Sequence, residues 1–206
     1  MRAAVVHETA THGKGTAMIS RPADGEYAAF YAGYVARVPD SGPVVALEAQ
    51  REAIRALGEL AEDVAAHRYA EGKWSVREVL GHLADAERVF TYRLLRIARA
   101  DATPLAGFDE NQWMTTAAFE RRPISEVAAE LLAVREATLA LIASLDAEAL
   151  GRSTVANGKP VSGRALCWIL AGHTQHHLGI LHDRYGLEEK LGPLLHRNWE
   201  PGLLGS

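Results

Sequence analysis

The stretch over residues 166–183, LCWILAGHTQHHLGILHD, predicts an amphipathic helix that faces the protein interior. Its apolar positions follow the 3-4-3-4 spacing of a core-facing helix, and His173 and His177 occupy two of them. Residues four apart lie one above the other, at roughly 6 Å. A buried imidazole needs a partner, because it otherwise loses its solvation uncompensated. Either each ring bonds a backbone carbonyl, or both rings share a metal ion.

Three further amphipathic segments predict an all-α protein. The first follows PDSGP, with Asp40 or Ser41 as its cap, and is expected to end near Asp63. The second opens with the capping-box pair Ser75 and Glu78 and continues to about residue 100. Four long segments imply a four-helix bundle.

The third of these segments starts at about Ser125, and its charged residues Glu130, Arg135 and Glu136 are expected to be solvated. Ser162 can cap the helix that carries the histidine pair, and Gly186 can end it. The connections over residues 101–123 and 146–161 are long, with one short helix expected after Asp109. No strand pattern is apparent.

The remaining segments complete a single-domain organisation. We expect a weakly ordered tail over residues 1–21, with Met18 as an alternative start, and the bundle over residues 22–186. Within the bundle, residues 26–38 predict an aromatic arm that packs on the body. Residues 187–206 are expected to lie on the bundle without regular structure.

Composition limits the classes of function. The net charge of −4 offers no basic face for nucleic acid, and no apolar run approaches the ~20 residues that a membrane span needs. Cys167 is the only cysteine, so no internal disulfide can form and a reducing cytoplasm is expected. Its place inside a core helix predicts a buried, inert thiol. A small molecule is the expected partner.

A third histidine lies at the flank of the second amphipathic helix. Inward positions on neighbouring helices of a bundle can converge, so His82 can join His173 and His177 as a third neutral nitrogen ligand. His176 is a rival that would need a rotated helix, and Asp85 is a weak candidate for a base or an orienting carboxylate. Three protein ligands leave coordination positions open. Zinc or nickel is favoured, with iron or manganese as the alternative.

The stretches WSVREVLGHLADAER, FDEN and AGHTQHHLGIL together resemble the DinB-like superfamily of metal-binding four-helix bundles, from about Pro22 to Gly186. The resemblance implies an up-down-down-up bundle that is often a homodimer. It also implies His82, His173 and His177 as metal ligands. Members include S-transferases that use bacillithiol or mycothiol, a mycothiol-dependent isomerase, and proteins of unknown activity.

Two classes of function follow from these observations. One is a metal-dependent enzyme that activates a low-molecular-weight thiol (S-transferase type) or water (hydrolase type). The other is a non-catalytic metal-binding or stress-response protein. A cavity beside the open coordination position favours the enzyme, whereas a fourth ligand such as Asp85 or His176 favours the structural role. The histidine pair lacks the glutamate of a zinc protease, and paired Glu-x-x-His motifs of a di-iron bundle are missing.

Overall fold

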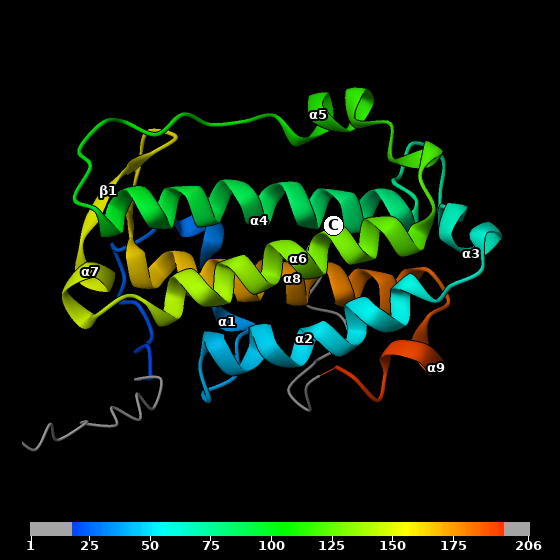
Figure 1. Cartoon of the computed structure of the whole chain (residues 1–206), viewed down its shortest axis with the longest axis horizontal. Coiled ribbons are helices and arrows are strands. Elements are labelled where there is room, and N and C mark those ends of the chain that lie inside the picture. Colours follow the sequence, from blue (N-terminus) through cyan, green and yellow to red (C-terminus); the bar gives the residue numbers. More distant parts are fainter. Residues whose placement is uncertain (1–17, 196–206) are drawn as a thin grey trace, which may run out of the picture.

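The computed structural model describes residues 18–195. Residues 1–17 of the expected tail over residues 1–21, and the last part of the chain from residue 196, lie outside the described residues. Four long helices form a bundle (Figure 1). They are α2 (Pro43–Gly58), α4 (Val76–Ala98), α6 (Ile124–Ala143) and α8 (Gly163–Arg184). The predicted fold class is therefore confirmed.

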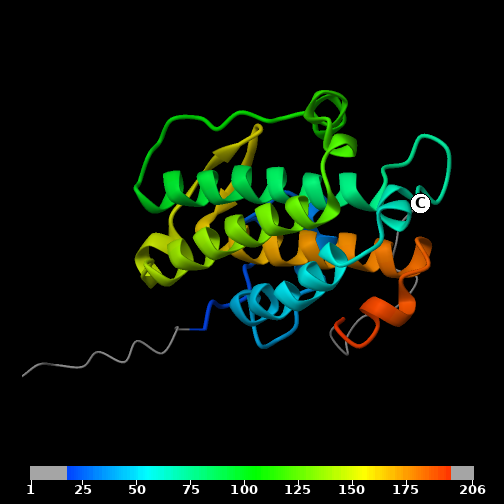
Figure 2. The same cartoon turned by 45° about the vertical axis from the view of Figure 1, so that its right-hand side comes forward.

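The order of the helices around the bundle follows from their contacts. Helices α2 and α4 each pack against both α6 and α8, so α2 lies diagonally opposite α4. The connection after α4 runs back along that helix in both views (Figure 1, Figure 2). Because of this return, α6 starts at the same end as α4 and runs parallel to it. The course is up-down-down-up, as the family resemblance implied.

Shorter elements surround the bundle. The helical ones are η1 (Ala29–Tyr31), α1 (Ala32–Ala36), α3 (Glu62–Ala66), α5 (Glu110–Ala117), η2 (Phe119–Arg121), α7 (Ala147–Gly151) and α9 (Glu188–Leu191). Helix α5 is the short helix expected after Asp109, whose side chain caps it. Helix α9 shows that the segment after residue 186 does contain regular structure.

The expectation that the chain has no strands was wrong. Strands β1 (Ser153–Ala156) and β2 (Lys159–Ser162) form an antiparallel hairpin, in which Val155 pairs with Pro160. The turn between them is Asn157-Gly158, and both residues have positive φ. A two-residue turn with positive φ at both positions has a backbone twist that matches the twist of the two strands it joins. Each strand has only four residues, too few for an alternating pattern to show.

The caps of the long helices explain where they begin. Ser75 and Glu78 form the predicted capping box at the start of α4, and the Ser162 hydroxyl accepts a hydrogen bond from the Ala165 amide at the start of α8. Helix α2 differs from the prediction. Gly42 precedes it without a side-chain cap, and the helix ends at Gly58, with α3 as a separate element.

The core consists of two apolar clusters with a polar layer between them. One cluster includes Leu47, Leu94 and Leu166, and the other includes Leu57, Leu80 and Leu181. The polar layer contains Arg135, which the sequence placed among solvated charges; its side chain is 0% exposed. It is paired with Glu87, a residue 48 positions away, so no local pattern reveals its burial.

The N-terminal segment packs directly onto α8. The Trp168 indole donates a hydrogen bond to the Ile19 carbonyl, and the Arg21 guanidinium donates to the Val35 carbonyl. Residues 18–21, which the sequence assigned to the tail, thus lie against the bundle. Helix α1 approaches α8 at Gly172, where a methyl group would overlap the Tyr34 carbonyl. This close approach brings the aromatic side chains of the arm next to the histidines.

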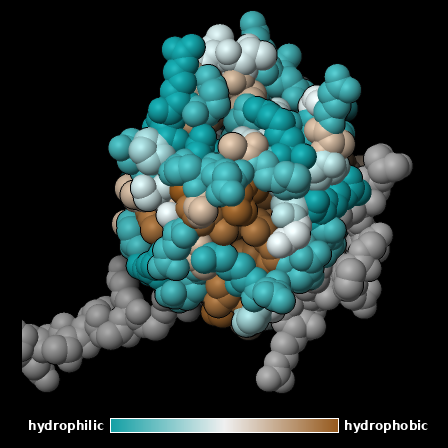
Figure 3. Space-filling view, turned by 90° about the vertical axis from the view of Figure 1, so that its right-hand side faces the viewer, coloured by the Kyte–Doolittle hydropathy of each residue, from teal (hydrophilic) through white to brown (hydrophobic). Residues whose placement is uncertain are grey.

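The end of the bundle that lies away from the β-hairpin carries α3 and α9 (Figure 1). Viewed from that end, a hydrophobic area lies in the middle of the face, with hydrophilic residues around it (Figure 3). Leu60, Val64 and Leu194 are partly buried and pack on the second core cluster, and Leu191 is fully buried. No helix within residues 18–195 is long and apolar enough to cross a membrane.

Candidate metal centre

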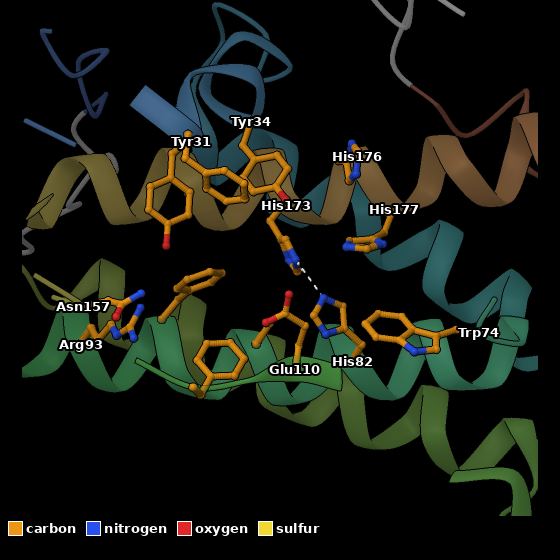
Figure 4. Close-up of a pocket in the computed structure, with 14 residues that line it drawn as sticks. Tyr31, Tyr34, Trp74, His82, Arg93, Glu110, Asn157, His173, His176 and His177 are labelled. Atoms are coloured by element: carbon orange, nitrogen blue, oxygen red, sulfur yellow. Dashed lines mark hydrogen bonds between the residues drawn. The ribbon is translucent and has the colours of Figure 1, made fainter. Parts of the chain in front are cut away.

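Three histidines meet inside the bundle. The ligand atoms of His82, His173 and His177 all lie within 4.8 Å of one another. The Nε2 atoms of His82 and His173 are 3.1 Å apart, a hydrogen bond in which one neutral ring donates to the other. Ring centroids are 4.6 Å apart for His173 and His177, and 4.9 Å for His82 and His177. The predicted convergence of α4 and α8 is thus present (Figure 4).

Two local features set the position of His82. The capping box fixes the start of α4 one residue after Ser75, so the register of His82 on the helix is defined. The Trp74 ring then lies against the His82 ring, with 4.8 Å between centroids. His82 is 7% exposed and faces inward rather than to the flank. On α8, residues 173 and 177 share one face because they are four positions apart.

The surroundings keep all three rings neutral. Burial and, to a smaller extent, nearby His176 together lower the pKa of His82 from 6.5 to about 4. Burial, followed by the charges of the neighbouring histidines, holds the pKa of His173 and of His177 well below the ordinary value. A metal ligand must be deprotonated, so these nitrogens are ready to coordinate at neutral pH without losing a proton.

The donor set fits a divalent metal ion. A tetrahedral zinc ion with Zn–N bonds of about 2.0–2.1 Å needs nitrogen atoms roughly 3.3 Å apart, and the His82–His173 pair is already at 3.1 Å. Neutral imidazoles suit zinc, nickel, copper and iron. Among residues 18–195, no carboxylate belongs to the group of ligand atoms. The three rings would therefore leave coordination positions open.

A cavity opens beside the histidines. Its volume is about 450 Å³, and all three histidines contribute to its wall. The aromatic side chains lining it come from the arm (Phe30, Tyr31 and Tyr34), from α4 (Phe90), from the position two residues before α4 (Trp74), and from the crossover connection (Phe108). The arm was expected to pack on the core; Tyr31 and Tyr34 do so partly, but they also form this wall.

Three polar side chains of the wall were missed by sequence reasoning. Glu110 at the start of α5 points toward the gap between His82 and His173, and Arg93 and Asn157 lie together at the other end of the cavity (Figure 4). Glu110 belongs to the FDEN stretch, which served only as a family signature. Nothing in the sequence marked Arg93 as a residue of the cavity wall, because a charged residue on a long helix is usually solvated.

The two rival site residues lie outside the cluster. His176 lines the cavity but faces Tyr34, with 5.3 Å between ring centroids. Asp85 lies beside His82 in a separate small pocket and forms an ion pair with Arg88 at 3.5 Å. Burial raises the pKa of the Asp85 carboxyl group. Neither residue takes a fourth position next to the three ligand atoms.

The cysteine behaves as predicted. Cys167 is 0% exposed in the first core cluster, and burial raises the pKa of its thiol to about 12. A thiol in such surroundings stays protonated and unreactive.

Comparison with known proteins agrees with this fold. The family model described as the DinB superfamily matches residues 46–181. A candidate metal-dependent hydrolase of Oceanobacillus iheyensis is 29% identical over 127 residues, which are 60% of this chain and 70% of that protein. The structure of YfiT from Bacillus subtilis, described as a probable metal-dependent hydrolase with an unusual four-helix bundle topology, has a TM-score of 0.61 at 20% identity. That match covers 75% of this chain and 90% of YfiT.

Proposed function

The chain belongs to the DinB superfamily, and from this premise we propose that it is a metal-dependent enzyme that hydrolyses a small molecule at His82, His173 and His177. The observation that carries the proposal is that these three neutral nitrogen ligands form part of the wall of a cavity of about 450 Å³. Such a cavity gives a substrate access to the open coordination positions. A purely structural site would be closed by a fourth protein ligand instead.

A divalent ion held by the three rings would supply Lewis acidity, lowering the pKa of a bound water toward ~7. The protein's own contribution to the reaction begins with Glu110. Its exposed carboxylate reaches into the cavity beside His82 (Figure 4) and would accept the proton of the attacking water. Glu110 thus takes the role of base that the sequence had offered to Asp85.

The aromatic wall has two roles in this proposal. Trp74 packs on His82, and Tyr34 and Phe90 pack on His173, so the ligand rings are held in place. The same side chains exclude bulk water from one side of the cavity, which strengthens the electrostatic interactions within it.

Transfer of a thiol is the second form of the proposed activity. Three neutral ligands and an open position would hold a low-molecular-weight thiol as its thiolate, which needs no protein base. Whether the activity depends on Glu110 distinguishes hydrolysis from thiol transfer. Hydrolysis requires this carboxylate, whereas thiol transfer proceeds without it.

The test begins with metal analysis of the purified wild-type protein and of the variants His82→Ala, His173→Ala and His177→Ala. Each variant is expected to lose bound metal. His67→Ala is the matched control, because His67 is exposed and lies outside the cluster, and it should keep the metal. Metal retained by all three cluster variants would overturn the ligand assignment.

The second part of the test measures turnover. Metal-loaded wild type is screened with ester and amide substrates and, separately, with electrophiles and several low-molecular-weight thiols. Glu110→Gln should keep the metal and lose about 10²–10⁴-fold in hydrolysis, the usual contribution of a general base. Thiol-dependent turnover that is unchanged in Glu110→Gln would instead support the transferase. Full metal loading without turnover in either screen would favour a non-catalytic metal-binding protein.

A further inference from the structure

Arg93 is a buried cation in the wall of the cavity. Its side chain is 4% exposed, and its Nη2 atom donates a hydrogen bond of 2.7 Å to the Ala106 carbonyl. Its guanidinium carbon lies 5.9 Å from the centre of the Phe108 ring. Within residues 18–195, no aspartate or glutamate forms an ion pair with Arg93.

The other two buried arginines have carboxylate partners. Arg135 pairs with Glu87, and Arg77 pairs with Glu62. A buried charge without a partner is costly, because it gives up its hydration without an equivalent interaction. A guanidinium group carries five N–H donors, of which Arg93 uses one on a described protein acceptor. The remaining donors of Arg93 are therefore available to an anion in the cavity that it lines.

Asn157 lies next to Arg93 at the same end of the cavity (Figure 4). Its backbone amide donates to the Leu105 carbonyl at 2.9 Å, which fixes the hairpin turn against the crossover connection. Its side chain packs against Gly107 and forms no hydrogen bond with another described residue. A free amide donor beside an unpaired guanidinium group is suited to bind a planar carboxylate.

We propose that Arg93 and Asn157 bind a carboxylate group of the substrate while its reacting bond lies at the histidine cluster. This inference rests on the proposed function. His82 and Arg93 are eleven positions apart on α4, about 16 Å along the helix axis. Tyr31, Phe90 and Phe108 also line this cavity. The substrate class is therefore an elongated monocarboxylate with an apolar or aromatic middle.

The charge of the site favours a monoanion. Among the lining residues within 18–195, Arg93 is the single cationic side chain, and Glu110 contributes a carboxylate at the opposite end (Figure 4). A phosphate dianion would need a second cation to balance its charge. A carboxylate is balanced by the one guanidinium group, which can bind both of its oxygens.

The experiment measures binding of paired probes by calorimetry to the metal-loaded protein. Each probe has a hydroxamate at one end to engage the metal, an alkyl spacer of varied length, and at the other end either a carboxylate or a neutral primary amide. Wild type should bind the carboxylate member about 10- to 100-fold more tightly than the amide, the usual worth of a charge-assisted hydrogen bond. This preference should peak at one spacer length.

Two variants and one control test the residues. Arg93→Met and Asn157→Asp should both reduce the preference for carboxylate to less than about threefold, because one removes the cation and the other neutralises it. Aspartate tolerates the positive φ of residue 157, and it leaves the hydrogen bond from Arg93 to Ala106 in place. Arg96→Met removes the same charge from α4, from a partly exposed ion pair with Asp101, and should keep the preference.

The outcomes separate this inference from the proposed function. Metal-free wild type should lose the hydroxamate contribution and keep the preference for carboxylate. Equal affinity for carboxylate and amide probes, or a preference that survives in folded Asn157→Asp and Arg93→Met proteins, would overturn the inference. Identical binding of hydroxamate probes with and without metal would overturn the proposed function alone. Tighter binding of a phosphonate probe than of the carboxylate would refute the monocarboxylate class.

Discussion

Arg135 and Glu87 form a two-bond ion pair that the four long helices enclose completely. The Arg135 Nε and Nη2 atoms each donate to a Glu87 carboxylate oxygen at 2.8 Å, and the side chains are 0% and 2% exposed. The same guanidinium donates to the Leu47 carbonyl and to the Thr174 hydroxyl. One side chain of α6 thereby bonds to α4, α2 and α8, and this fixes how the helix that carries His82 sits against the helix that carries His173.

Removing either partner of this pair should destabilise the protein strongly. Arg135→Met leaves a buried carboxylate, and Glu87→Gln leaves a buried guanidinium, so each is expected to lower the free energy of unfolding by about 3–5 kcal/mol. Urea denaturation of the metal-free protein measures this loss. The double variant Arg135→Met, Glu87→Met leaves no uncompensated charge and should be more stable than the sum of the single losses predicts. Additive losses would show that the pair is not coupled.

Loss of the cap of α4 should have a smaller effect. The Glu78 amide donates to the Ser75 hydroxyl at 3.3 Å, and the Ser75 amide donates to the Glu78 carboxylate at 2.6 Å. Ser75→Ala removes one of the two bonds and should cost about 1 kcal/mol in thermal or urea unfolding. Ser144→Ala is the control, because this exposed hydroxyl only donates to the Leu141 carbonyl. A cost of Ser75→Ala no larger than that of Ser144→Ala would contradict the role of the cap.

A side chain at Gly172 should destabilise the protein. A methyl group there would overlap the backbone carbonyl of Tyr34, and no rotamer change can remove that clash. Gly172→Ala should therefore displace α1 from α8 and lower the free energy of unfolding by about 1–3 kcal/mol, despite the higher helix propensity of alanine. Metal content should stay near wild type, because α4 and α8 supply the ligands.

Gly33→Ala is the matched control for the same interface. Gly33 lies on α1, and a methyl group there meets no atom within 4 Å. This variant should be neutral or slightly stabilising. Equal effects of the two substitutions would show that α1 does not depend on the close approach at Gly172.

The long helices could be predicted because their signals are local, whereas their up-down-down-up course was implied only by the family resemblance. The apolar spacing and the caps at Ser75 and Ser162 define helix registers, and these registers decide that His82, His173 and His177 face inward. Convergence of the three rings then follows from the packing of α4 on α8. The hairpin was missed, although the Asn157-Gly158 dipeptide is the usual signal for such a turn.

The cavity could not be predicted, because its wall comes from parts of the chain without a repeating pattern. Glu110 and Phe108 belong to the crossover connection, Tyr31 to the arm, and Asn157 to the hairpin turn. Their meeting depends on tertiary packing, including the approach at Gly172. Arg135 shows the same limit, since its burial depends on Glu87, which lies in another helix.

The depressed pKa values of the cluster histidines make the stability of the metal-free protein depend on pH. Burial lowers the pKa of His82 to about 4 and holds that of His173 and His177 well below 6.5. Between about pH 4 and pH 6.5 the unfolded chain therefore binds protons that the folded protein does not. Stability should be constant above that window and fall as the pH drops through it, by up to about 1.4 kcal/mol per pH unit for each histidine that stays neutral.

Urea denaturation in the presence of a chelator at several pH values between 4.5 and 7.5 measures this slope. His177→Asn removes one of the buried titrating groups, so its slope below pH 6.5 should be smaller than that of wild type by up to about 1.4 kcal/mol per pH unit. His67→Asn removes an exposed histidine and should leave the slope unchanged. Metal ions should oppose the acid effect, because protons compete with the metal for the same nitrogens. If stability falls with pH equally steeply in wild type and in His177→Asn, then His177 binds protons in the folded protein as readily as in the unfolded chain. That result would contradict the prediction.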